Sequence, residues 1–87
     1  MSNLNDEAKT ASRLRWQCRR GMLELDELLQ SYLDHRYAHA DANEQNAFRS
    51  LLKLSDQEIF DYFFSALAPL DSELRNVIQH IRRAAGA

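Results

Sequence analysis

Apolar residues recur along the chain at steps of three and four, the spacing that places side chains on one face of an α-helix. The clearest series begins at Met22 and continues to Leu33, with polar residues on the opposite face. Further series predict five helices in all, at about residues 6–19, 22–35, 41–54, 55–68 and 72–81. The strict alternation typical of strands is absent. The pattern predicts an all-α fold, a compact five-helix bundle.

Local signals place the ends of these helices. Gly21 follows a run that ends in arginines and predicts the end of the first helix, because glycine adopts the positive φ found after many helix C-termini. Ser55 and Glu58 have the spacing of a capping box, and Asp41 with Glu44 has the same spacing. The third and fourth helices therefore begin at these positions.

The remaining connections follow from similar signals. Pro69 prevents the fourth helix from continuing, and Asp71 or Ser72 caps the fifth. Residues 36–40 are expected to form a loop or a frayed helix end, and residues 82–87 to fray. The first helix offers only a narrow apolar face (Ala8, Ala11, Leu14, Cys18), and the fourth is expected to bury a broader one (Ile59, Phe60, Phe63, Leu67).

The size of the chain limits it to one domain. With 87 residues, we expect a single helical domain over 1–87, ordered from about residue 6 to about residue 83. A core this small leaves little material for a deep, water-excluding active-site pocket. The sequence therefore favours a binding module over an enzyme.

Cysteine content and hydropathy predict the compartment. Cys18 is the single cysteine, so one chain cannot form an internal disulfide or a thiolate zinc site, and its place on an apolar face predicts an inert buried thiol. His35 and His39 have metal-ligand spacing but lack a strong third ligand. No signal-peptide pattern or long apolar stretch is present, which predicts a cytoplasmic protein without membrane insertion.

Arginines gather in one segment. Although the net charge is −2, Arg13, Arg15, Arg19 and Arg20 fall within eight positions. Trp16 projects away from the apolar face of the first helix, on the same side as Arg13 and Arg20. Tryptophan and arginine dominate binding hot spots, so this side is a candidate protein-binding surface. Alternatively, Trp16 packs beneath a neighbouring helix and the arginines surround it.

The junction after this segment combines Arg20, Gly21 and Glu24. A carboxylate in the first turn of the second helix complements the helix dipole, and Arg20 could pair with Glu24 across the corner. This purely structural interpretation accounts for the three residues. It leaves the doubled arginine and the nearby Trp16 unexplained.

The segment Arg13–Asp26, with the sequence RLRWQCRRGMLELD, resembles the signature region of the SdhE-type FAD assembly factors, also called succinate dehydrogenase flavinylation factors. The Arg-Gly-x-x-Glu pattern of that family is met by Arg20, Gly21 and Glu24. Trp16, Cys18, the later segment 55–60 and the chain length fit the family too. Two departures lie near the fourth helix: Tyr62 stands where many relatives carry tryptophan, and Leu67-Ala68 lacks a glycine common before the proline.

The resemblance implies a five-helix assembly chaperone that is not an enzyme. It would dock on the flavoprotein subunit of succinate dehydrogenase, and on fumarate reductase as a further candidate client, and promote covalent attachment of FAD. The FAD would stay on the client, with at most transient contact. Carried over, Arg20, Gly21 and Glu24 become partner-binding residues, with Arg13 and Trp16 as neighbours. This requires an outward-facing corner, and internal pairing of both Arg20 and Glu24 would contradict it.

Two other functions fit parts of the sequence. One is an antitoxin-like or regulatory module that binds a different protein. The other is nucleic-acid binding through the arginine cluster, against which the net acidic charge counts. The sequence leaves open a monomer or a weak dimer, because the apolar second and fifth helices could serve either a core or an interface.

Overall fold

The computed structural model describes the backbone of residues 4–86 and the surroundings of side chains from residue 9 to residue 86. It contains five α-helices and a short 3₁₀-helix, and residues 4–86 contain no strand. In chain order the elements are α1 (Leu4–Gln17), α2 (Leu23–His35), η1 (Tyr37–His39), α3 (Ala42–Leu52), α4 (Asp56–Phe64) and α5 (Ser72–Gly86). The predicted all-α fold is confirmed.

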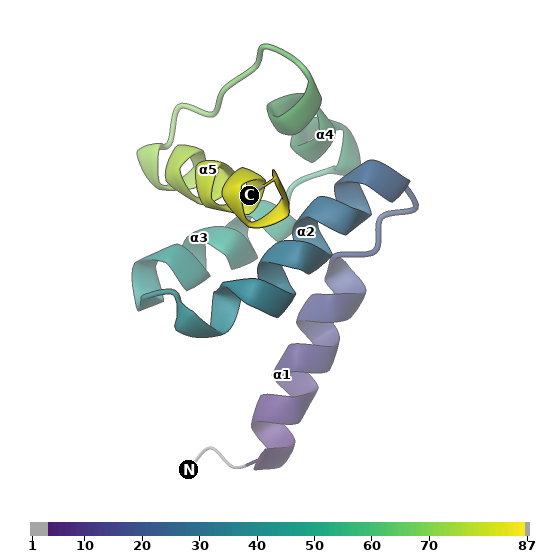
Figure 1. The fold of residues 1–87 in the computed structure, drawn as a ribbon, viewed down its shortest axis with the longest axis vertical. Helices are drawn as coiled ribbons and strands as arrows, with labels where there is room; N and C mark the ends of the chain where they lie inside the picture. Colours follow the sequence, from purple (N-terminus) through teal and green to yellow (C-terminus); the bar gives the residue numbers. More distant parts are fainter. Residues whose placement is uncertain (1–3, 87) are drawn as a thin grey trace.

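Helices α2, α3 and α5 form the body of the molecule. Helix α5 packs against both α2 and α3, while α4 closes one end of the group (Figure 1). Helix α1 projects from the corner that joins it to α2, and its first turns extend away from the other helices (Figure 1). The extents of 42 × 26 × 25 Å reflect this elongation.

One continuous apolar core joins all five helices. Its members are the side chains that the periodicity placed on buried faces (Leu14, Cys18, Leu25, Leu29, Tyr32, Ala47, Phe48, Leu51, Leu52, Ile59, Phe63, Val77, Ile78, Ile81). Tyr32 and Phe48 are its largest fully buried side chains, with ring centroids 4.6 Å apart. Among the described side chains of α1, only Leu14 enters the core, and Cys18 enters it directly after the helix ends, so α1 is attached to the body through its C-terminal half.

Side-chain caps begin α3, α4 and α5 at the predicted positions. Asp41 accepts a hydrogen bond from the backbone N–H of Glu44 at 2.8 Å, and Ser55 accepts one from that of Glu58 at 3.2 Å. Before α5, it is Asp71 whose carboxylate accepts the backbone N–H of Glu73 at 2.8 Å. Each cap satisfies an amide that has no partner within its helix.

The boundaries of several segments differ from the prediction. Helix α1 ends at Gln17, two residues earlier than expected, and residues 37–39 form a 3₁₀ turn where a loop or frayed end was expected. Helix α5 continues to Gly86 where fraying was expected from Arg82 onward. Arg82 donates from Nη2 to the carbonyl of Tyr62 at 2.8 Å, which ties this part of α5 to α4.

Two apolar residues that were expected to be buried are exposed. Ala11 lies on the part of α1 that projects into solvent, and Ala8, expected beside it, lies outside the described side chains. Helix α4 ends at Phe64, so Leu67 falls in the connection to α5 and is exposed. The prediction of burial was wrong for Ala11 and Leu67, because neither residue lies on a helical face that meets a neighbouring element.

Candidate functional site

The connection between α1 and α2 turns at Gly21, whose φ is +78°. Glycine adopts this left-handed conformation readily, whereas any residue with a Cβ is strained there. A Cβ built on Gly21 has no neighbouring atom within 4 Å. Gly21 is therefore required by the backbone of the corner, and the space outside it is open, so another molecule can approach closely.

The carboxylate of Asp26 holds this corner in shape. It accepts the backbone N–H of Arg20 at 2.8 Å and that of Gly21 at 3.1 Å. Asp26 lies in the first turn of α2, so one side chain satisfies two amides of the turn that precedes its own helix. From the sequence, Asp26 was identified only as part of a family pattern. The signal that could have identified its role is an acidic residue shortly after a glycine turn.

The side chain of Arg20 is directed into its own fold. Its Nε donates to the carbonyl of Gln17 at 2.8 Å, and its Nη1 contacts the carboxylate of Asp56 at 2.9 Å. The same guanidinium donates to the carbonyl of Leu52, the last residue of α3, and to that of Leu54 in the connection to α4. Only 14% of the side chain is exposed. Arg20 thus joins the α1–α2 corner to the α3–α4 corner.

This arrangement corrects three expectations about Arg20. It pairs with Asp56 and not with Glu24, and its guanidinium does not face outward. Helix α1 ends before Arg20, so Arg20 does not continue the helical face of Arg13 and Trp16. The corner nevertheless remains accessible, because Gly21 and Glu24 are both exposed.

Large apolar side chains are exposed on both sides of the corner. Trp16, one residue before the end of α1, is 72% exposed, and Leu23 at the start of α2 is 74% exposed. Trp16 therefore does not pack beneath a neighbouring helix. Arg13, three residues before Trp16 on α1, is also exposed and forms no ion pair with any described residue. Leu23 was not singled out from the sequence, although its position off the apolar face of α2 indicated exposure.

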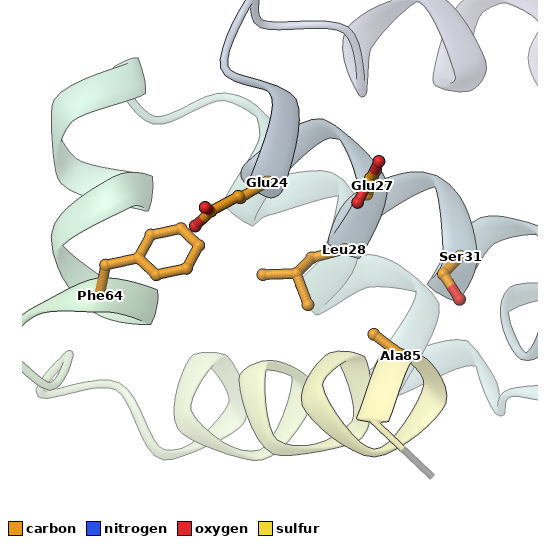
Figure 2. A pocket seen from close by; sticks show the side chains of 6 residues that line it. All are labelled: Glu24, Glu27, Leu28, Ser31, Phe64 and Ala85. Carbon is orange, nitrogen blue, oxygen red and sulfur yellow. The ribbon is translucent and has the colours of Figure 1, made fainter.

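Glu24 marks the beginning of an open groove beside the corner (Figure 2). Its carboxylate points toward the ring of Phe64 on α4, and Leu28 points from α2 toward α5 (Figure 2). The groove encloses about 410 Å³, and Ala85 lines its α5 side. Glu24 makes no side-chain hydrogen bond or ion pair with the described residues, so its charge is available to a partner.

The arginine cluster is partly neutralised within the molecule. Arg15 forms an ion pair with Asp34, which raises the pKa of the guanidinium, and Arg20 pairs with Asp56. Two of the four arginines thus already contact carboxylates. This pairing leaves Arg13 and Arg19 as the exposed cations of the segment that form no ion pair with a described residue, and it weakens the case for a broad nucleic-acid surface.

A second polar cluster surrounds Glu44 and lies away from the corner. Its carboxylate accepts the phenolic O–H of the buried Tyr32 at 2.7 Å and the Nε of Arg36 at 2.7 Å. The Arg36 hydrogen bond lowers the pKa of Glu44, and burial raises that of Tyr32. His80 of α5 lies 3.6 Å from the same carboxylate. The cluster joins α2, α3 and α5, and its role is structural.

The chemically reactive candidates take no part in the corner. Cys18 is fully buried, and burial raises its pKa to about 12, so the thiol stays protonated at neutral pH, as predicted for an inert side chain. Among the residues that the structure describes, no three side chains of the His, Cys, Asp and Glu types come together to hold a metal ion. No described helix is long and apolar enough to cross a membrane.

Comparison with known proteins gives one consistent family. Residues 12–85 match the protein family described as "Flavinator of succinate dehydrogenase". The chain is 44% identical over 69 residues to the FAD assembly factor SdhE of Pseudomonas aeruginosa, covering 79% of this chain and 82% of the relative. It is 33% identical over 78 residues to the FAD assembly factor SdhE of Coxiella burnetii, covering 90% and 95%. For that of Shewanella oneidensis the figures are 37% over 76 residues, 87% and 93%. No solved structure gives a significant match.

Proposed function

This chain belongs to the family of FAD assembly factors that flavinate succinate dehydrogenase, and we propose that it docks on the flavoprotein subunit of that enzyme and promotes covalent attachment of FAD. Related fumarate reductase flavoproteins are proposed as further clients. The observation that carries the docking surface is the accessible corner of Gly21 and Glu24, flanked by the exposed Trp16 and Leu23.

Exposed apolar side chains support this surface. Trp16 is 72% exposed, so a large apolar area is in contact with water in the free protein. A partner that covers this area would gain free energy from its removal from water. Trp16 supplies a rigid apolar anchor, and Glu24 supplies an uncompensated charge beside it. Such a pairing of a central aromatic group with polar contacts around it is typical of protein-binding hot spots.

The three residues of the Arg-Gly-x-x-Glu pattern take different roles in this proposal. Arg20 is a positioning residue, because its guanidinium binds the end of α3 and Asp56. Gly21 gives the corner its left-handed turn and leaves open space for the client backbone. Glu24 is the member that contacts the client directly, with Arg13 as a further exposed cation nearby.

The chain would act by positioning the client and not by catalysis. If the FAD domain of the client is held in one geometry, the entropy cost of aligning the reacting groups is met on binding and no longer adds to the barrier of the reaction. FAD is the substrate of the client's own modification, and its chemistry remains with the client and the flavin. We therefore expect no stable FAD on this chain.

The test is covalent flavin on the client. A strain without the gene should lose covalently bound flavin on the succinate dehydrogenase flavoprotein, measured by in-gel fluorescence, and the wild-type gene should restore it. Trp16→Ala and Glu24→Gln should restore less, because they remove contacts without removing a partner inside the fold. Normal flavin fluorescence in the deletion strain would reject the proposal.

Folding controls separate docking from stability. Trp16→Ala and Glu24→Gln should give the circular dichroism spectrum of the wild type, since both side chains are exposed. Gln17→Ala is a matched control on α1, because the side chain at this exposed position makes no hydrogen bond with the described residues and should leave flavin attachment unchanged. If either test variant unfolds the domain, its effect on flavin attachment does not support a contact.

A further inference from the structure

The groove that begins at Glu24 combines an apolar floor with an acidic rim. Three helices build it, and most of its lining lies outside the Arg-Gly-x-x-Glu pattern (Glu24, Glu27, Leu28 and Ser31 of α2, Phe64 of α4, Ala85 of α5). Its volume of about 410 Å³ is large enough for side chains of another protein and falls within the range of ligand pockets. Figure 2 shows it as a trough between α2 and the end of α5.

The charge of the rim is uncompensated. Glu24 and Glu27 are three residues apart on α2, a spacing that makes them neighbours on the helix surface. Neither carboxylate forms a hydrogen bond or an ion pair with any described residue, and no lining residue of the groove is basic. Two adjacent carboxylates repel each other. A cation placed between them would be attracted to both and would relieve this repulsion.

The floor is held in place by aromatic packing. Phe64 is 40% exposed, and its ring lies 4.7 Å from that of Phe60 between centroids, so it presents a fixed apolar surface. Leu28 adds a partly buried aliphatic side chain, and Ala85 is too small to fill the opposite side. A long aliphatic side chain can therefore lie on Leu28 and Phe64.

We propose that this groove binds a segment of the client flavoprotein that carries an arginine or lysine between apolar residues. The cationic head would lie between Glu24 and Glu27, and its aliphatic stem would cover Leu28 and the ring of Phe64, which also attracts a cation. The groove is continuous with the exposed corner through Glu24, so one client could cover both. This inference rests on the proposed function and extends it to a second contact.

The test measures the affinity of the purified chain for the succinate dehydrogenase flavoprotein. Glu27→Gln should weaken binding about threefold to tenfold at low salt, because it removes one charge of the rim. Ala85→Arg should weaken binding more than tenfold, because it fills the groove and supplies an internal cation for the two glutamates. Raising the salt concentration should weaken binding of the wild type more than that of Glu27→Gln.

Matched controls lie on other faces. Glu73→Gln removes an exposed carboxylate at the start of α5, and Ala38→Arg adds an arginine at an exposed alanine of η1. Both should bind like the wild type. Circular dichroism of all four variants checks that the groove variants retain the fold.

Contact can be tested directly by zero-length carbodiimide crosslinking. A crosslink from Glu24 or Glu27 to a client lysine, or loss of affinity on charge reversal of one client arginine at the same place, supports the proposal. Affinities of Glu27→Gln and Ala85→Arg equal to the wild type would overturn it, while the proposed function would stand if Trp16→Ala still weakened binding. A dimer of this chain that Ala85→Arg dissociates would also overturn it, because a second copy would then occupy the groove.

Discussion

At the scale of single residues, the members of the Arg-Gly-x-x-Glu pattern differ in role: Arg20 is structural, whereas Glu24 is proposed to contact the client. The guanidinium of Arg20 binds Asp56 and the carbonyls at the end of α3, and truncation would leave those carbonyls without their donor. We expect Arg20→Ala to lower the free energy of unfolding by about 2–3 kcal/mol, measured by urea denaturation. Arg19→Ala, at the exposed neighbouring position, should change it by less than about 0.5 kcal/mol. Equal stability of Arg20→Ala and the wild type would contradict the clamp.

Substitutions of Gly21 distinguish the effect of backbone strain from the effect of contact with the client. Gly21→Ala should lower the free energy of unfolding by about 1 kcal/mol, because φ is +78° while the Cβ itself meets no neighbour. Gly21→Asn should cost less, since asparagine tolerates this conformation better than other residues with a side chain. If the client approaches closely, Gly21→Asn should still weaken binding, as measured by affinity for the flavoprotein. A variant that binds like the wild type would argue against close approach.

Of the features of single residues at this corner, some could be predicted from the sequence and others could not. The positive φ of Gly21 was predictable, because a glycine at a helix junction has a local cause. The direction of the Arg20 side chain was not, because its partners lie 32 to 36 residues further along the chain. Their proximity depends on how α3 and α4 meet the corner, which a local pattern does not contain.

At the scale of helices and their contacts, the Glu44 cluster makes stability depend on pH. Hydrogen bonds from Arg36 and Tyr32 lower the pKa of Glu44 in the folded protein, so its contribution is present above the pKa of the unfolded chain. That contribution is lost as pH falls through the lower, folded pKa. We expect Glu44→Gln to be less stable than the wild type at about pH 7, with a difference that shrinks between about pH 5 and about pH 3. Urea denaturation at several pH values measures it.

The matched control for this prediction is Glu73→Gln. Glu73 is exposed and its side chain makes no hydrogen bond with the described residues, so its substitution should cause little change over the same pH range. A pH-independent difference between Glu44→Gln and the wild type would show that the neutral hydrogen bond from Tyr32, and not the charge, carries the effect.

The helical elements themselves were largely predictable. The caps at Asp41 and Ser55 and the apolar series of α2, α3 and α5 depend on residues three or four positions apart. The Glu44 cluster was missed, because it joins three helices, although the buried position of Tyr32 on its helix required a partner for the phenolic O–H. The prediction that Leu67 is buried was wrong because Leu67 continues the helical spacing of Ile59 and Phe63, whereas α4 ends at Phe64.

At the scale of the whole molecule, the attachment of α1 determines how the binding surface behaves. Among its described side chains only Leu14 enters the core, with Cys18 just after its end, whereas α2 and α5 contribute several side chains each. The periodicity of α1 predicted a packed face, but a narrow stripe of alanines removes too little apolar area from water to hold the helix against the body. Trp16 thus lies on a helix with few described core side chains, beside a corner that Asp26 and Arg20 hold in place.

Hydrogen exchange tests how firmly α1 is attached to the rest of the molecule. In the free protein, amides of residues 12–17 should exchange faster than those of residues 25–32, because α1 can open without exposing the rest of the core. Addition of the succinate dehydrogenase flavoprotein should slow exchange in residues 12–17 and around Gly21, and leave the middle of α3 unchanged. If residues 12–17 are as protected as α2 before the client is added, α1 is part of the rigid body. The docking surface is then already ordered before binding, and the client does not order α1.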